Sequence, residues 1–134
     1  MASALEAKAG DFVAAMKAAI DEGHKRGVKL TGHLCSVGYR EAVALGIDNL
    51  EHGLFVNTDF DPEKRPDYCP PDAMAKLAGL DTKGDAAKAT IRTMVQSKVP
   101  MTSTLPVFEL FVPNRPPLEP RVLEAMAPDV RAEY

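Results

Sequence analysis

The feature that most constrains the fold is a pair of short β-prone segments that each end in a histidine, with one short helix predicted between them. Residues 28–33 have the sequence VKLTGH and residues 47–52 have the sequence IDNLEH. Between them, residues 37–45 follow Ser36, a residue type that favours helix N-termini, and they stop at Gly46. A strand, a crossover helix and a second strand form a βαβ unit, which makes the strands parallel. The sequence therefore predicts an α/β fold built from parallel βαβ units.

Amphipathic segments extend this alternation in both directions. Residues 11–26 start at Asp11, carry apolar side chains at steps of three and four, and precede Gly27, so we expect a helix there. Residues 57–72 contain four prolines and are predicted to form a long irregular loop. The other expected elements are a short helical stretch at 73–80, a helix at 85–97 with Ala89, Ile91, Met94 and Val95 on its inner face, a third strand at 99–108, a rigid proline-rich connector, and a last helix whose apolar residues run from 118 to 130.

Composition narrows the functional classes. The 134 residues carry 16 basic and 19 acidic side chains, a formal charge of −3, which argues against a nucleic-acid partner bound mainly by electrostatics. No apolar run approaches the roughly 20 residues that cross a bilayer, and the N-terminus lacks the pattern of a signal peptide. We therefore expect a cytoplasmic protein with no membrane partner. Cys35 and Cys69 form no CxxC pair and are predicted to be free, structural thiols.

His33 and His52 are the most informative residues for function, because each closes a predicted strand. Neighbouring parallel strands lie about 4.8 Å apart, and α/β folds place their chemistry at the carboxyl ends of such strands. We therefore expect the two imidazoles to converge and to share one divalent metal ion, at metal–nitrogen distances of about 2.1 Å. Glu51 alternates to the opposite face and is expected to orient or support the site. A structural role for both histidines is the alternative, and His24, on the first helix, is assigned one.

The segments that carry these histidines, VKLTGHLCS and GIDNLEHG, resemble strands five and six of the metal-dependent amidohydrolase superfamily, in particular its imidazolonepropionase-like and prolidase-like branch. In that family the histidine ending strand five and the histidine of an EHG motif are metal ligands, so the resemblance assigns His33 and His52 to the metal. SKVPMTSTLPVFE would correspond to strand seven, and residues 28–109 are the span that we align. The resemblance implies part of a (β/α)₈ TIM-type barrel that hydrolyses an amide or related C–N bond with metal-activated water.

In such a barrel, the loop after the second predicted strand would lie on the catalytic face. Arg65 and Tyr68 in this loop, with Asn57 and Asp59, then become candidates for substrate contact. Thr102, in the third predicted strand, is a further candidate because alternation turns one or two of the hydroxyls of residues 102–104 inward. The alternative is that the loop residues are simply solvated.

The chain also departs from the family pattern. It has no HxH pair, and it ends at Tyr134 before an eighth strand, so the strand-one ligands and the strand-eight aspartate are missing. A complete barrel needs on the order of 250 residues. We therefore predict a single partial domain, with a helical segment at 1–27, a βαβαβ core at 28–109, and a connector and helix at 110–134. The expected cofactor is a divalent metal, Zn²⁺ above others, bound only if further ligands complete the site.

Three functional hypotheses stay open. The first is an amidohydrolase-type enzyme for small-molecule amide or peptide-like substrates, either as a fragment of a longer enzyme that is inactive alone or as a piece completed by another chain. The second is a non-catalytic α/β interaction module derived from such a barrel. The third is a hydrolase that uses Cys35 as nucleophile beside His33.

Partial barrels leave surface uncovered. A three-stranded parallel sheet has two open edges, and an inner face without its usual neighbours exposes apolar side chains. We therefore expect the chain to associate with itself or with a complementary chain. The residues that motivate this expectation are Val28, Leu30, Ile47 and Leu50.

Overall fold

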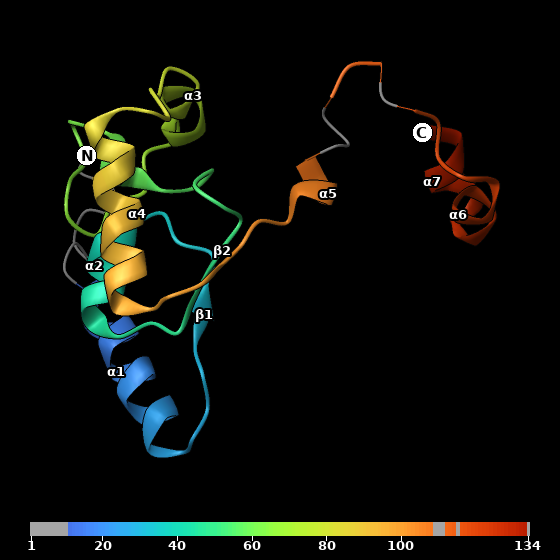
Figure 1. The fold of residues 1–134 in the computed structure, drawn as a ribbon. Coiled ribbons are helices and arrows are strands. Elements are labelled where there is room, and N and C mark those ends of the chain that lie inside the picture. Colours follow the sequence, from blue (N-terminus) through green and yellow to red (C-terminus); the bar gives the residue numbers. More distant parts are fainter. Residues whose placement is uncertain (1–10, 109–111, 115, 134) are drawn as a thin grey trace, which may run out of the picture. The chain divides into compact units, whose positions relative to one another are not determined.

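The computed structural model describes residues 11–108, 112–114 and 116–133 (Figure 1). The chain divides into two compact units, the first ending at Thr104 and the second beginning at Leu105. The first unit is a mixed α/β fold with a three-stranded parallel sheet, which confirms the predicted βαβ arrangement. Residues 1–10, the start of the predicted N-terminal helical segment, lie outside the described residues.

Helix α1 covers Asp11–Lys25, within one residue of the prediction. Its apolar side packs on the core through Ile20, which is fully buried, with Val13 and Met16 beside it. The first turn of a helix has backbone N–H groups without partners inside the helix. Here the carboxylate of Asp67, in the proline-rich loop, accepts a hydrogen bond from the Val13 N–H at 2.9 Å. A residue 54 positions away therefore caps this helix and ties the loop to it.

The sheet consists of three short strands, β1 (Thr31–Gly32), β2 (Asn49–Glu51) and β3 (Met101–Thr102), in the order β1-β2-β3. All pairs are parallel, but each strand is shorter than predicted. Ahead of β1, the Asp48 carboxylate accepts the Leu30 N–H at 2.8 Å, so a side chain takes the place of a ladder bond. At its carboxyl end, β2 stops where the backbone turns into the left-handed conformation.

The core lies on one face of the sheet. Figure 1 shows α1, α2 (Tyr39–Leu45) and α4 (Asp85–Ser97) on the same side of the strands. The apolar core residues are Ile20, Leu34, Val37, Tyr39, Ala42, Val43, Ile47, Leu50, Val56 and Met94. The expectation that Ile47 and Leu50 would lie on an uncovered face is therefore wrong, because both are buried under the helices.

Helix α2 starts two residues later than predicted and is not capped by Ser36. Its N-terminus at Gly38 is capped from the loop that follows β2, since Asp59 accepts the Arg40 N–H at 2.9 Å and Asn57 accepts the Tyr39 N–H at 3.2 Å. A Cβ atom at Gly38 would lie 2.0 Å from the Asp59 carboxylate, so the close approach requires glycine. The end of α2 at Gly46, with φ of 97°, agrees with the prediction.

Helix α4 has the predicted bounds but turns a different side to the core. Ala87, Thr90 and Met94 are buried, whereas Ile91 is 45% exposed and Val95 is 70% exposed. The buried residues follow the helical period, and each exposed residue is the next position along, about 100° further round the helix. The predicted inner face is therefore wrong for Ile91 and Val95, which line an open apolar groove beside β3.

Residues 105–108 are helical rather than extended, which corrects the long third strand. Thr104 has a positive φ of 48°, which ends the extended segment, and Pro106 lies in the first turn of α5 (Leu105–Phe108), where proline is tolerated. The predicted last helix is divided into α6 (Pro120–Ala125) and α7 (Pro128–Glu133). Pro128 disfavours a helical conformation at the residue before it, so one continuous helix cannot form. Residues 109–111, 115 and 134 lie outside the described residues.

The proline-rich loop is irregular, as predicted. It contains one short 3₁₀ helix, η2 (Thr58–Phe60), and leads to the short helix α3 (Ala73–Leu77). In the part of the chain that the structure describes, no helix has the length and apolar character needed to cross a membrane.

A disulfide joins Cys35 to Cys69, so the prediction of two free thiols is wrong. Cys35 lies in the loop after β1 and Cys69 in the loop after β2, with Cα atoms 5.0 Å apart. The same loops also meet where Thr58 Oγ1 donates to Cys35 O at 2.7 Å and Lys64 Nζ donates to Ser36 O at 2.6 Å. The parallel pairing of β1 and β2 creates this proximity, and the spacing of the cysteines alone does not reveal it.

Replacing both cysteines by serine should lower the free energy of unfolding by about 3 kcal/mol, because the crosslink restricts the unfolded chain over a separation of 34 residues. Urea denaturation of the oxidised wild type and of Cys35→Ser/Cys69→Ser measures this loss. Wild type kept in a thiol reductant is the control and should match the variant. Identical midpoints for oxidised and reduced wild type would contradict the predicted contribution.

Candidate functional site

The two strand-end histidines lie against each other, as predicted. His33 follows β1 and His52 follows β2, and their ring centroids are 4.6 Å apart with an interplanar angle of 64°, an edge-to-face arrangement. His33 is exposed and His52 is half-buried, so neither ring is enclosed by the core. The carboxyl edge of this sheet therefore presents two imidazoles to one small space.

The strand register shows that this convergence needs more than parallel pairing. Gly32 pairs with Leu50, so continued pairing would place His33 opposite Glu51, one residue short of His52. Because successive side chains of a strand point to opposite faces, a regular continuation of β2 would direct His52 away from His33. The expectation that the histidines occupy equivalent strand positions is therefore wrong, and a turn in the backbone brings them together.

That turn is a pair of left-handed residues, His52 with φ of 70° and Gly53 with φ of 65°. A left-handed conformation costs a residue with a Cβ atom roughly 1–2 kcal/mol, so the surroundings must hold it. The buried hydroxyl of Tyr39 lies 2.7 Å from the carbonyl oxygens of both Glu51 and Gly53, and its single proton is shared between these two acceptors. On the other side, the Gly53 N–H donates to Thr102 O at 3.0 Å. The turn is thus held between α2 and β3.

A second contact fixes the ring of His52. Its Nδ1 lies 2.9 Å from Oγ1 of Thr104, a hydrogen bond whose donor depends on the imidazole tautomer. Metal-binding histidines usually engage their second nitrogen in such a bond, which orients the ring. Among the described residues, Nε2 of His52 has no hydrogen-bond partner, so it is the nitrogen left for a ligand.

The sheet face opposite the core carries a polar network that spans all three strands. Asn49 Nδ2 donates to Glu51 Oε1 at 2.8 Å, to Thr102 Oγ1 at 3.0 Å and to Thr31 Oγ1 at 3.1 Å, while Thr31 donates to the same Glu51 oxygen. The hydrogen bond from Thr31 holds the pKa of Glu51 below its usual value, with further lowering by Asn49 and Thr102. Glu51 is therefore engaged within the sheet, in keeping with the supporting role expected for it.

Imidazole side chains such as those of His33 and His52 can bind a metal ion. Among residues 11–108, 112–114 and 116–133, no group of three or more His, Cys, Asp or Glu side chains is arranged to hold a metal. Two imidazoles on one ion, at bond lengths of about 2.1 Å, would have ring centres roughly 5 Å apart, close to the 4.6 Å between His33 and His52. The separation of the two ring centres is therefore close to that of two imidazoles on one ion.

The sequence-derived substrate candidates lie in two places. Arg65 stacks its guanidinium 4.1 Å from the ring centre of Tyr68, a cation–π contact within the proline-rich loop. Thr102 belongs to the polar network on β3. The other two loop candidates, Asn57 and Asp59, cap helix α2.

Two features of the site escaped sequence reasoning. The disulfide occupies the sulfur of Cys35, so the alternative of a Cys35 nucleophile lacks its free thiol.

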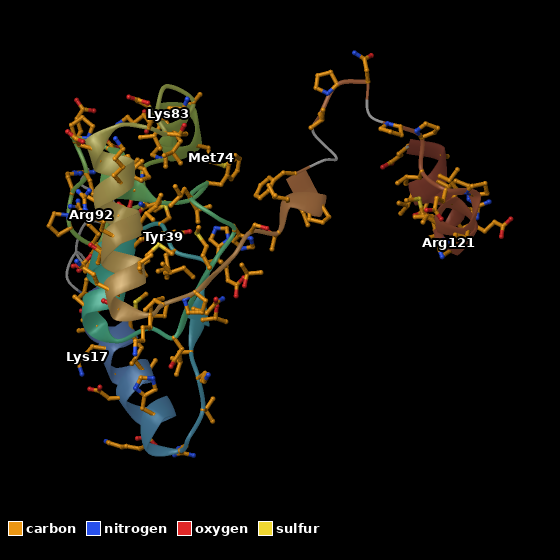
Figure 2. All side chains as sticks on the ribbon, viewed as in Figure 1. Lys17, Tyr39, Met74, Lys83, Arg92 and Arg121 are labelled. Atoms are coloured by element: carbon orange, nitrogen blue, oxygen red, sulfur yellow. A yellow bond between two sulfur atoms is a disulfide. The ribbon has the colours of Figure 1, made fainter. Side chains whose placement is uncertain are left out.

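The sequence pattern does not single out Tyr39, although it is fully buried in the core beneath the histidine turn and is labelled in Figure 2. The available signal was a phenol on an otherwise apolar helix face, since a buried tyrosine hydroxyl needs a partner.

Comparisons of the chain with protein-family models, with curated proteins and with solved structures give no match.

Glu51→Gln should reduce the loss of the free energy of unfolding that occurs as the pH falls into the acidic range. Because the folded-state pKa of Glu51 is lowered, its ionised form stabilises the fold above the ordinary value of 4.5, and this contribution is lost as the pH falls through the lowered pKa. Urea titrations from about pH 7 to pH 3 measure the effect. A Glu51→Gln profile parallel to that of wild type would contradict the assignment.

Proposed function

We propose that this chain is part of an amidohydrolase-type, metal-dependent hydrolase of amide or related C–N bonds, in which His33 and His52 bind a divalent metal ion. The observation that carries the proposal is the convergence of these two rings, 4.6 Å apart, at the carboxyl ends of adjacent parallel strands. The resemblance of the GHLCS and EHG segments to amidohydrolase strands five and six supports the same assignment.

The surroundings of His52 favour a ligand role over a purely structural one. Thr104 engages Nδ1, which leaves Nε2 without a hydrogen-bond partner among the described residues, on a ring 4.6 Å from that of His33. When bound, a divalent ion such as Zn²⁺ would supply an activated water at neutral pH. His33 and His52 would hold the ion, and the Tyr39 and Thr104 contacts would orient His52 toward it.

The three-stranded sheet is compatible with a segment of a (β/α)₈ barrel. Helices cover one face, as they do outside a barrel, and the polar network of β1, β2 and β3 faces the other way. The proposal includes further ligands from elsewhere, because catalytic zinc normally has three protein ligands. A small amide or peptide-like substrate is proposed, with Arg65, Tyr68 and Thr102 as its candidate contacts.

Zinc titration tests the metal site directly. We expect weak one-to-one binding by the wild type, with the dissociation constant raised at least about tenfold in His33→Ala and in His52→Ala, since each change removes one of two ligands. His24→Ala is the matched control, because His24 does not lie at the carboxyl ends of the strands. Its Nε2 is 2.8 Å from a carboxylate oxygen of Asp48, the residue just before β2. Isothermal titration calorimetry measures the affinities. Zinc binding that survives both site substitutions would remove these histidines from the site.

A second proposal is a non-catalytic interaction module, and one observation favours it. Ile91, Val95 and Met101 are exposed around an apolar groove of about 400 Å³ between α4 and β3. Groups of exposed apolar side chains mark interaction surfaces. We take a second copy of the chain as the occupant, in line with the self-association expected of an incomplete sheet.

Sedimentation velocity distinguishes this second proposal. The wild type should form a dimer at micromolar concentrations, and Val95→Lys should shift it toward monomer because the substitution places a charge in the groove. Ala86→Lys, at an exposed position near the start of α4 that does not line the groove, is the control. A stable wild-type monomer over this concentration range would contradict self-association.

A further inference from the structure

The hydroxyl of Tyr39 lies in an unusual position relative to the candidate site. It lies 2.7 Å from each of the carbonyl oxygens on both sides of His52, those of Glu51 and Gly53, so the two acceptors share its single proton. Tyr39 is fully buried, and burial raises the pKa of its phenol, so the hydroxyl keeps its proton as a donor. One side chain of α2 thus contacts the backbone on both sides of His52, a residue of the proposed metal site.

The backbone at His52 has a reason to need this support. Its φ of 70° lies in the left-handed region, and Gly53 continues the turn at 65°. Without the turn, the β2 register would send the imidazole to the core face, away from His33. The Tyr39 contact offsets part of the conformational cost, since this turn directs two carbonyl oxygens toward α2 where they share one buried O–H donor.

We propose that Tyr39 is a positioning residue that holds His52 in its left-handed conformation and so keeps its ring against His33. The importance of this positioning for metal binding rests on the proposed function. The conformational claim itself stands on the hydrogen bonds, the register and the backbone angles. A purely structural Tyr39 would contribute to stability without controlling where His52 points.

Tyr39→Phe is the test, because it removes the hydroxyl and keeps the ring that fills the core. The readout is nuclear magnetic resonance of the full chain without metal, using the backbone chemical shifts of residues 51–53 and the proton contacts between the rings of His33 and His52. In wild type we expect backbone chemical shifts typical of a left-handed conformation at His52, and proton–proton contacts between the rings of His33 and His52. In Tyr39→Phe we expect both signatures to be lost or averaged, while the other strands keep their shifts.

Val43→Ala is the matched control, since Val43 is a buried residue of the same helix that makes no side-chain hydrogen bond to the turn. It should lower stability, as a core truncation does, and leave both His52 signatures intact. Unchanged signatures in Tyr39→Phe would overturn the proposal. Their equal loss in Val43→Ala would also overturn it, because the effect would then follow general stability.

Zinc affinity gives the consequence for the proposed site. Removal of a group that orients a metal ligand typically weakens binding about 10- to 100-fold, so Tyr39→Phe should raise the dissociation constant at least about tenfold and Val43→Ala should leave it unchanged. A wild type that binds no zinc would refute the proposed function, and the resonance data would still decide the role of Tyr39. A Tyr39→Phe variant that binds zinc as tightly as wild type would overturn the positioning role.

Discussion

The candidate site depends on one backbone feature, the left-handed turn at His52 and Gly53 where β2 ends. Parallel pairing of β1 and β2 brings the two loops together, but its register, with Gly32 opposite Leu50, leaves His33 and His52 out of step by one residue. The turn corrects this offset and places the rings 4.6 Å apart. It is stabilised on one side by α2 and on the other by β3. Core, sheet and site are therefore coupled through the same three residues, 51–53.

The burial of Leu50 explains why the turn occurs where it does. Leu50 is fully buried under the helices, which fixes the face that each neighbouring residue of β2 takes. Asn49 and Glu51 then point to the opposite face, where they form the polar network with β1 and β3. A shift of one residue would bury Glu51 and expose Leu50, so this register is strongly specified. His52 is the first residue after β2, and its backbone departs from the strand conformation.

Local sequence signals predicted the elements well where a helix has clear ends. The apolar period and end signals of residues 11–26 and 85–97 gave α1 and α4 nearly as observed, and Gly46 closes α2 as expected. The nearness of His33 and His52 was predicted from the parallel strands, but the register and the turn that bring the rings together were not. The extended segment at 99–108 was overestimated, since β-prone composition does not show that Pro106 opens a helix.

The features that sequence reasoning missed all depend on long-range contacts. Asp67 caps α1 across 54 residues, and Cys35 meets Cys69 only because two loops follow neighbouring strands. The role of Tyr39 depends on the backbone of β2, which a helical pattern cannot show. Ile91 and Val95 were assigned to the core because apolar character alone does not fix which side of a helix faces inward. Each of these features needs the folded arrangement of distant segments.

The most direct test of the account is a crystal structure of the zinc-soaked chain, with diffraction data collected at the zinc absorption edge. We expect one anomalous peak, about 2.1 Å from a ring nitrogen of His33 and about 2.1 Å from Nε2 of His52. Nδ1 of His52 should remain hydrogen-bonded to Thr104. An anomalous peak at other residues, with no zinc ion between His33 and His52, would contradict the proposed metal site.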